Sequence, residues 1–278
     1  MFNVIVRVCL VTVCGCLFLL SGIASAKDET FVFSPDAESP KSLYWFGSVA
    51  YGPREMGGTI FVNRYGPISG IATPDTLGLD TAESFQFRLG AIYKRWRFMV
   101  DYLPTNYSGE GFAAVEIKVG DLPTIPAQTN VASDIDTDLL LLNVGYELLH
   151  TEKWVGAVGV GFGRTALDIA LVPTVGQPLA FDGTTPFGYI SGDIARHFGR
   201  WNMRLGIGWI SAEFDGTRID YGNYNASVAY VLTQDKFRSE IVAGYRQIDL
   251  KFDYNVPGER VLTDISLEGP YVGLVFAW

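Results

Sequence analysis

Apolar residues alternate with polar or small residues along most of this chain, and the spacing of an amphipathic helix is almost absent. Between Trp201 and Trp209 the odd-numbered residues are all apolar, whereas the even-numbered ones are Asn, Arg and Gly. A period of two places these sets on opposite faces of a β-strand. The first face is too apolar for water, and the second is too polar and small for a sandwich core. Lipid outside and a narrow, partly polar lumen inside satisfy both.

The same alternation predicts ten strands, at 42–52, 82–94, 96–107, 134–148, 154–166, 186–198, 201–213, 221–232, 237–251 and 266–278. An even number of strands brings both termini of the chain to the same side of the membrane, as in single-chain bacterial barrels. We therefore predict an all-β fold, a closed antiparallel up-and-down transmembrane β-barrel of about ten strands. Eight or twelve strands are the alternatives, because weak segments near 184–198 and 252–268 can be merged or split.

The predicted connections fall into two classes. Four are short (94–95, 149–153, 199–200 and 233–236), and five are generally longer (53–81, 108–133, 167–185, 214–220 and 252–265). Short periplasmic turns and long extracellular loops are typical of membrane barrels. A soluble sandwich has no reason to divide its connections in this way.

Aromatic residues gather at the strand ends beside the short turns. We predict that five of them form a periplasmic aromatic girdle: Trp96, Trp154, Trp201, Phe237 and Trp278. The alternative is that they belong to the core of a soluble β-protein.

The amino terminus has the layout of a secretory signal peptide, with one basic residue, Arg7, an apolar run over 8–20 and a small-residue ending at Ala26. The apolar run is too short to span a bilayer as a helix, and a lipoprotein signal at Cys16 is a weaker alternative. We predict a signal peptide at 1–26, a periplasmic segment at 27–41 and the barrel at 42–278. All three cysteines precede the expected cleavage site, so the mature chain offers no disulfide, thiol nucleophile or thiolate metal site.

The charge balance disfavours one class of partner. The chain has 21 basic and 30 acidic residues; removal of Arg7 leaves 20 and 30, a net charge of −10. Nucleic-acid binding requires Lys and Arg to neutralise phosphates. We therefore expect no nucleic-acid partner.

Nine charged residues share the phase of the polar strand face and are predicted to face the lumen: Arg88, Arg97, Asp101, Glu147, Asp193, Arg204, Arg238, Glu240 and Arg246. Five bases and four acids make this set nearly balanced. Charges inside a narrow barrel are tolerable when they are paired or hydrated. We favour an ion-pair network that fills and rigidifies the barrel, with a narrow polar path for small solutes as the alternative.

The ending Gly269–Trp278 resembles the carboxy-terminal strand of Gram-negative outer-membrane proteins, in which an alternating apolar strand ends in an aromatic residue, usually Phe. The segment Gly244–Asp249 resembles a penultimate strand of many small barrels, of the OmpA/OmpW-like class. The resemblance implies location in the outer membrane of a Gram-negative bacterium and assembly from the periplasm. The implied partners are outer-membrane lipid and lipopolysaccharide, and the barrel-assembly machinery through the last strand.

Catalytic and metal-binding motifs are sparse. The histidines, His150 and His197, are predicted at the periplasmic end, whereas proteases of the omptin type, also ten-stranded, and lipid A deacylases carry their acid–base groups at the extracellular side. A nucleophile there would lack its usual base. Asp134, Asp136 and Asp138 lie on one strand face and form a candidate calcium site, or else a solvated strand extension. We predict no cofactor and no other metal site.

Three functions are compatible with this pattern. The first is a non-enzymatic outer-membrane barrel, either structural or a narrow low-conductance pore for small solutes. The second is a surface adhesion or ligand-binding barrel that uses the long loops 53–81 and 108–133 against an unknown surface ligand. The third is a hydrolase acting on lipid A or peptides, which requires His150 or His197 to lie near extracellular carboxylates.

Overall fold

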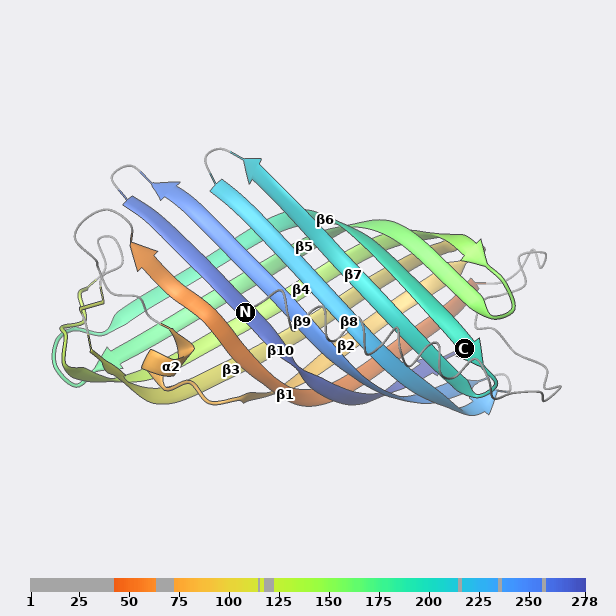
Figure 1. Ribbon diagram of the computed structural model, residues 1–278, viewed down its shortest axis with the longest axis horizontal. Coiled ribbons are helices and arrows are strands. Elements are labelled where there is room, and N and C mark those ends of the chain that lie inside the picture. Colours follow the sequence, from red (N-terminus) through yellow and green to blue (C-terminus); the bar gives the residue numbers. More distant parts are fainter. Residues whose placement is uncertain are drawn as a thin grey trace, which may run out of the picture. The chain divides into compact units, whose positions relative to one another are not determined.

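The computed structural model describes residues 43–63, 73–114, 116–117, 123–214, 217–234, 237–256 and 259–278. Ten antiparallel strands and one helical turn make up this part of the chain: β1 (Leu43–Asn63), α2 (Pro74–Leu77), β2 (Ala82–Tyr93), β3 (Trp96–Ala113), β4 (Thr129–His150), β5 (Trp154–Pro173), β6 (Leu179–Phe198), β7 (Trp201–Phe214), β8 (Thr217–Gln234), β9 (Arg238–Val256) and β10 (Glu259–Ala277). Each strand pairs with its sequence neighbours, and β1 pairs with β10 to close the barrel (Figure 1). The predicted fold class and the count of ten strands are confirmed.

Two predicted segments, the signal peptide at 1–26 and the periplasmic segment at 27–41, lie outside the described residues. Within the described ranges, none of the helical structure is long and apolar enough to cross a membrane.

Large apolar side chains cover the outside of one part of the barrel wall. On β2, Phe85, Phe87 and Leu89 are 51%, 47% and 50% exposed. Every strand contributes at least one such residue: Trp45, Phe87, Phe98, Leu142, Val160, Ile190, Ile207, Val228, Ile241 and Leu274. An apolar surface this extensive is unfavourable in water but suits contact with lipid. We call it the apolar belt.

The barrel has two different ends. Both described termini, Leu43 and Trp278, lie at the end that carries the short turns, where Lys94 (φ 55°) and Gly199 (φ 57°) adopt the left-handed conformation of tight hairpins. The backbones of Trp45 and Trp278 are joined there by two hydrogen bonds of 3.0 Å. Short turns mark the periplasmic side of membrane barrels, so this is the periplasmic end and the opposite end is extracellular.

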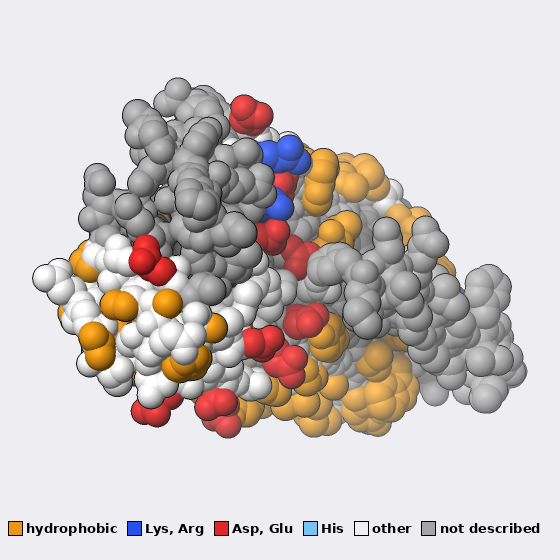
Figure 2. All heavy atoms as spheres, turned by 60° about the vertical axis from the view of Figure 1, so that its left-hand side comes forward, with side chains coloured by type: hydrophobic (Ala, Val, Ile, Leu, Met, Phe, Trp, Pro, Cys, Tyr) orange, Lys and Arg blue, Asp and Glu red, His pale blue; other side chains and the backbone are white. Residues whose placement is uncertain are grey.

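Above the belt, toward the extracellular end, the polarity of the wall inverts. The outer face becomes acidic, with exposed Glu55, Glu83, Asp134, Asp136, Asp138, Asp168, Asp182 and Glu213. Figure 2 shows acidic side chains between the extracellular part of the wall and the apolar residues beyond it. The inner face becomes apolar, because one cluster of buried side chains fills this half: Leu103, Tyr107, Ile135, Ile169, Leu171, Leu179, Tyr221, Leu250, Phe252, Ile265 and Leu267 among others. We call this cluster the apolar core.

The run Leu139–Leu142 on β4 shows where the inversion occurs. Leu139 and Leu141 point inward and are 2% and 4% exposed, whereas Leu142 points outward and is 42% exposed. Four consecutive leucines therefore serve both the belt and the core. With the partly buried Met56 and Ile210, the apolar core draws on all ten strands.

The long loops lie where they were predicted, but their predicted bounds were too wide. β1 continues to Asn63, β3 to Ala113 and β5 to Pro173, and β4 and β6 begin at Thr129 and Leu179. Residues 53–63, 108–113 and 129–133 of the segments predicted as loops are therefore parts of strands that rise beyond the membrane. The apolar and polar faces exchange sides there, so a search for apolar residues on the lipid-facing phase ends the strands too early.

A group of three aromatic rings separates the apolar core from the lumen below. The rings of Phe187 and Tyr189 on β6 lie 4.7 and 5.4 Å from the ring of Tyr221 on β8. Tyr189 rests against Gly161 of β5, where a Cβ atom would lie 2.2 Å from the ring. Glycine on this inner face makes the space for the aromatic side chain. We call the three rings the aromatic septum.

Candidate functional site

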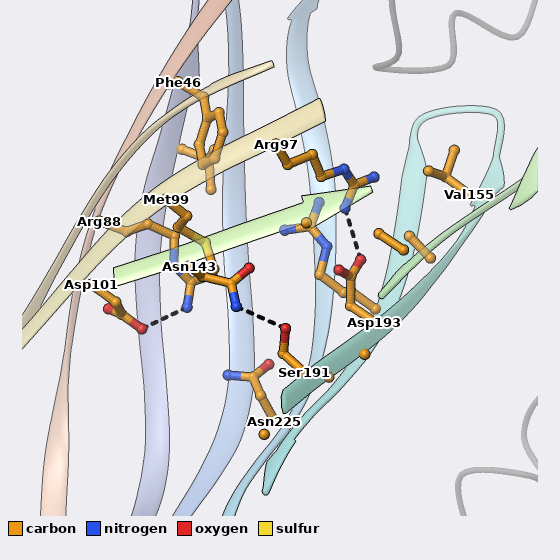
Figure 3. A pocket seen from close by; sticks show the side chains of 18 of the residues that line it. Phe46, Arg88, Arg97, Met99, Asp101, Asn143, Val155, Ser191, Asp193 and Asn225 are labelled. Carbon is orange, nitrogen blue, oxygen red and sulfur yellow. Dashed lines mark hydrogen bonds and ion pairs between the residues drawn. The ribbon is translucent and has the colours of Figure 1, made fainter. Parts of the chain in front are cut away.

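A cavity of about 180 Å³ occupies the lumen on the periplasmic side of the septum (Figure 3). Tyr189 of the septum lines its inner end, and Val155 and Ala277 line it near the periplasmic end of the barrel. Most of its polar lining consists of arginine, asparagine and acidic side chains. Because the apolar belt surrounds this part of the wall, the cavity lies at the level of the membrane and combines charged with apolar lining residues.

The deepest ion-pair group is built around Asp101 of β3. Its carboxylate lies 2.9 Å from Arg88 and 3.0 Å from Arg246, and it accepts a 3.0 Å hydrogen bond from Gln86. Asp101 and Arg246 are 4% and 1% exposed. The register pairs Arg88 directly with Asp101, so the β2–β3 ladder itself brings these two charges together. Two cations share one anion here, leaving a local charge of +1.

A second group, nearer the periplasmic end, has the opposite balance. Arg97 lies 2.6 Å from Glu147 and 2.9 Å from Asp193. Glu147 is fully buried, and its second oxygen lies 2.9 Å from Nδ1 of His150. One cation thus joins acidic residues from β4 and β6, and this group ties three strands together across the lumen.

A third group lies at the start of β9. Arg238 and Glu240 form an ion pair of 2.5 Å, and the amide of Asn202 donates to the same carboxylate at 3.1 Å. The ring of His197 lies within hydrogen-bond distance of the Asn202 amide oxygen. His197 and His150 are therefore both engaged at the periplasmic end, where the sequence predicted them.

Arg204 differs from the other lumen cations. It is exposed to the cavity that it lines, and among the described residues no ion pair or hydrogen bond of its side chain is found. Asp193 lies one diagonal step away across the β6–β7 ladder, since its register partner is Gly206. The carboxylate of Asp193, however, is already bonded to Arg97.

The structure places all nine predicted lumen charges on the inner face, and eight of them fall into the three groups above. The sequence did not single out Arg54 of β1, which is 2% exposed and donates to the backbone oxygens of Gly269 (3.0 Å) and Arg246 (3.3 Å). Arg54 follows Ala50 and Gly52 at a spacing of two residues, so the alternation of β1 could have predicted that it points inward. It was missed because residue 54 was assigned to a loop.

The five aromatic residues predicted for the girdle lie beside the short turns or at the C-terminus. Trp96 packs on Tyr146 (5.1 Å) and Trp201 on Tyr230 (4.9 Å). The others are Trp154, which contacts Arg196, Phe237, which contacts Phe276, and the exposed Trp278. Their placement at one end of the belt is the arrangement expected of an interfacial girdle.

The candidate calcium residues are spread along the outer face of β4. Asn106 donates to Asp134 at 3.0 Å and to Asp136 at 2.6 Å, and Tyr102 donates to Asp138 at 3.0 Å. In the described part of the chain, no three acidic, histidine or cysteine residues are grouped as metal ligands. The three aspartates therefore belong to the polar outer wall above the belt.

Comparison with known proteins identifies the fold. No protein-family model matches, and no curated protein matches by sequence. The chain is similar in structure to the outer membrane protease OmpT from Escherichia coli, with a TM-score of 0.56 and 8% identity over 87% of this chain and 100% of that one. OprG from Pseudomonas aeruginosa (TM-score 0.39, 11% identity, 85% and 95% covered) and Ail of Yersinia pestis (0.36, 8%, 86% and 100%) are more distant.

The fold is that of a small Gram-negative outer-membrane β-barrel. The apolar belt is consistent with this and places the barrel in the outer membrane. The similarity establishes the fold only, because proteins with the same fold can differ in activity.

Proposed function

We propose that this protein is a non-enzymatic structural barrel of the outer membrane, closed to the passage of small solutes. The observation that carries the proposal is the apolar core, which packs side chains from every strand into the extracellular half of the lumen. Ile135, Leu171 and Leu179 in this core are all fully buried. Ions would have to cross this packed region without hydration, which is strongly unfavourable.

The distribution of histidine supports the non-enzymatic part of the proposal. The chain contains two histidines, His150 and His197, and both lie at the periplasmic ends of their strands. A hydrolase acting at the cell surface with a histidine base would need one at the other end. The hydrolase hypothesis therefore has no support from the position of these residues.

A second candidate function, surface adhesion or ligand binding, is favoured by one observation. The strands rise beyond the belt as a continuous wall whose outer face is polar and acidic. Such a wall could present a rigid surface to a basic partner. Loss of cell or matrix binding after substitution of Asp134, Asp136 and Asp138 by Asn would support it.

Planar-bilayer recording tests the primary proposal. We expect the folded protein to show no stepwise current, while a general porin inserted under the same conditions conducts. Folding before insertion is checked by the difference in gel mobility between heated and unheated samples. Regular ion-selective steps from the folded protein would overturn the closed-barrel proposal and favour the narrow pore.

A further inference from the structure

We propose that the lumen cavity binds a small oxyanion, of phosphate or carboxylate chemistry, which enters from the periplasmic end. This inference goes beyond the structural role proposed above and does not rest on the absence of conductance. It rests on the charge of the cavity wall, on unpartnered arginine donors and on the shape of the compartment.

The ion pairs of the lumen do not balance. The five arginines and four acids of the nine-residue set leave a net charge of +1 (five minus four), with His150 and His197 taken as neutral. Arg204 is the arginine of the set that makes no ion pair among the described residues, because each of the four acids is bonded to another arginine. Arg204 is exposed to the cavity, so an anion there could bind it without breaking an existing ion pair.

Two other arginines present donors that have no partner. Nη1 of Arg246 and Nε of Arg88 are buried and without a hydrogen bond in the part of the chain that the structure describes. Both residues line the same cavity as Arg204. Because these two nitrogen atoms have almost no exposed surface, their guanidinium groups would have to rotate toward the cavity to donate to an anion there. Oxyanions are the acceptors that guanidinium groups bind best.

Neutral donors complete the lining. Asn143 donates to Ser191 at 2.8 Å, and Asn225 is linked to Tyr271 at 3.0 Å, which holds these side chains at the cavity wall (Figure 3). Amide and hydroxyl groups beside a guanidinium are well suited to the remaining oxygen atoms of a phosphate or carboxylate.

The size and position of the cavity restrict the ligand and its route. A cavity of about 180 Å³ has room for a small anion together with several water molecules. Phe187 and Tyr221 of the septum, and the apolar core behind them, block the extracellular side. The lining reaches Ala277 at the periplasmic end, so the ligand would be a solute of the periplasm.

Calorimetric titration of the detergent-solubilised protein with inorganic phosphate, and separately with malonate, tests the proposal. We expect saturable binding of one anion per chain, and the tighter of the two ligands identifies the chemical class. Arg204→Gln is expected to weaken binding at least about tenfold, the effect of losing one charged hydrogen bond. Arg204→Lys should retain part of the affinity.

The matched control is Arg218→Gln, which removes an arginine that is 56% exposed on β8 and has no contact with the cavity. It should bind like the unsubstituted protein. If Arg204→Gln does not fold, the unsubstituted protein still gives a test, because phosphate at low millimolar concentration should raise its urea midpoint and the rise should saturate. The general stabilising effect of phosphate salts needs far higher concentrations and does not saturate. Failure of both anions to bind, equal binding by Arg204→Gln, or an equal loss in Arg218→Gln would overturn the proposal.

Discussion

The replacement Asp101→Asn removes the anion that holds two arginines in the lumen. Arg88 and Arg246 lie 2.9 and 3.0 Å from this carboxylate, and Arg246 is 1% exposed. Neutral asparagine can still accept a hydrogen bond but cannot compensate either charge. The substitution therefore leaves two neighbouring cations in a compartment enclosed by the apolar belt.

The expected cost is large. Each contact at about 3 Å corresponds to roughly 5 kcal/mol of attraction at an effective dielectric constant of about 20. Relaxation and entry of water recover part of this, and breaking a buried pair by removing one partner costs roughly 3 to 5 kcal/mol. We predict a loss in this range for Asp101→Asn. The double variant Asp101→Asn/Arg246→Gln should lose less than the sum of the two single variants, because it no longer strands Arg246.

Urea unfolding in lipid vesicles, followed by tryptophan fluorescence, measures these differences. Asp193→Asn is a useful comparison, because Asp193 is more exposed (31%) and Arg97 keeps Glu147 as a partner. We expect a smaller loss there. A change below about 1 kcal/mol for Asp101→Asn, or strict additivity in the double variant, would refute the view that the lumen charges form coupled pairs.

Three further predictions concern the wall and the core. Tyr107→Phe should raise the free energy of unfolding by about 1 kcal/mol in urea titrations, because the Tyr107 hydroxyl is fully buried and has no hydrogen-bond partner among the described residues; a loss of stability would indicate a further hydrogen bond. Above the belt, partial burial and nearby acidic residues raise the pKa of Asp249, whereas hydrogen bonds from Ser211 and Arg218 outweigh partial burial and lower the pKa of Asp220. At about pH 7, Asp249→Asn should therefore stabilise and Asp220→Asn destabilise the barrel. As the pH falls, the Asp249→Asn effect should disappear below the unfolded-state pKa of about 4, and the Asp220→Asn effect only at lower pH, below the lowered folded-state pKa; equal signs at neutral pH would contradict this. Gly161→Val should abolish folding on heat-modifiability gels, because its Cβ would lie 2.2 Å from the Tyr189 ring, and unchanged folding would show that the septum can move.

The membrane half of the barrel could be predicted from the sequence because its outward face is uniformly apolar. Trp201 to Trp209 and Val272 to Phe276 follow one rule, and the short turns fix the register of each hairpin. The lumen charges followed from the same phase. The pairing of these charges could not be predicted. Arg97 on β3 and Asp193 on β6 are separated by two strands in the barrel wall, and their spacing in the sequence does not indicate that their side chains meet across the lumen.

The extracellular half could not be predicted in the same way. There the inner residues, such as Ile135 and Leu171, are apolar and the outer ones, such as Asp136, are charged. The alternation continues there, but the apolar residues now point inward and the polar ones outward. A search for apolar residues at outward positions therefore takes these strand segments for loops. Recognising the exchange at Leu139–Leu142 would have extended the strands and predicted the apolar core.

The most direct test of this account asks where water reaches the lumen. All cysteines of the sequence lie at positions 9, 14 and 16, so single cysteines placed in the barrel of a protein that lacks those residues report their own surroundings. Ser191 lines the cavity, and Ser133 points into the apolar core and is 4% exposed. We predict that a water-soluble maleimide labels Ser191→Cys rapidly in the folded, membrane-inserted protein and leaves Ser133→Cys unlabelled until urea unfolds it. Equal labelling of both positions would contradict the division into a polar cavity and a sealed apolar half.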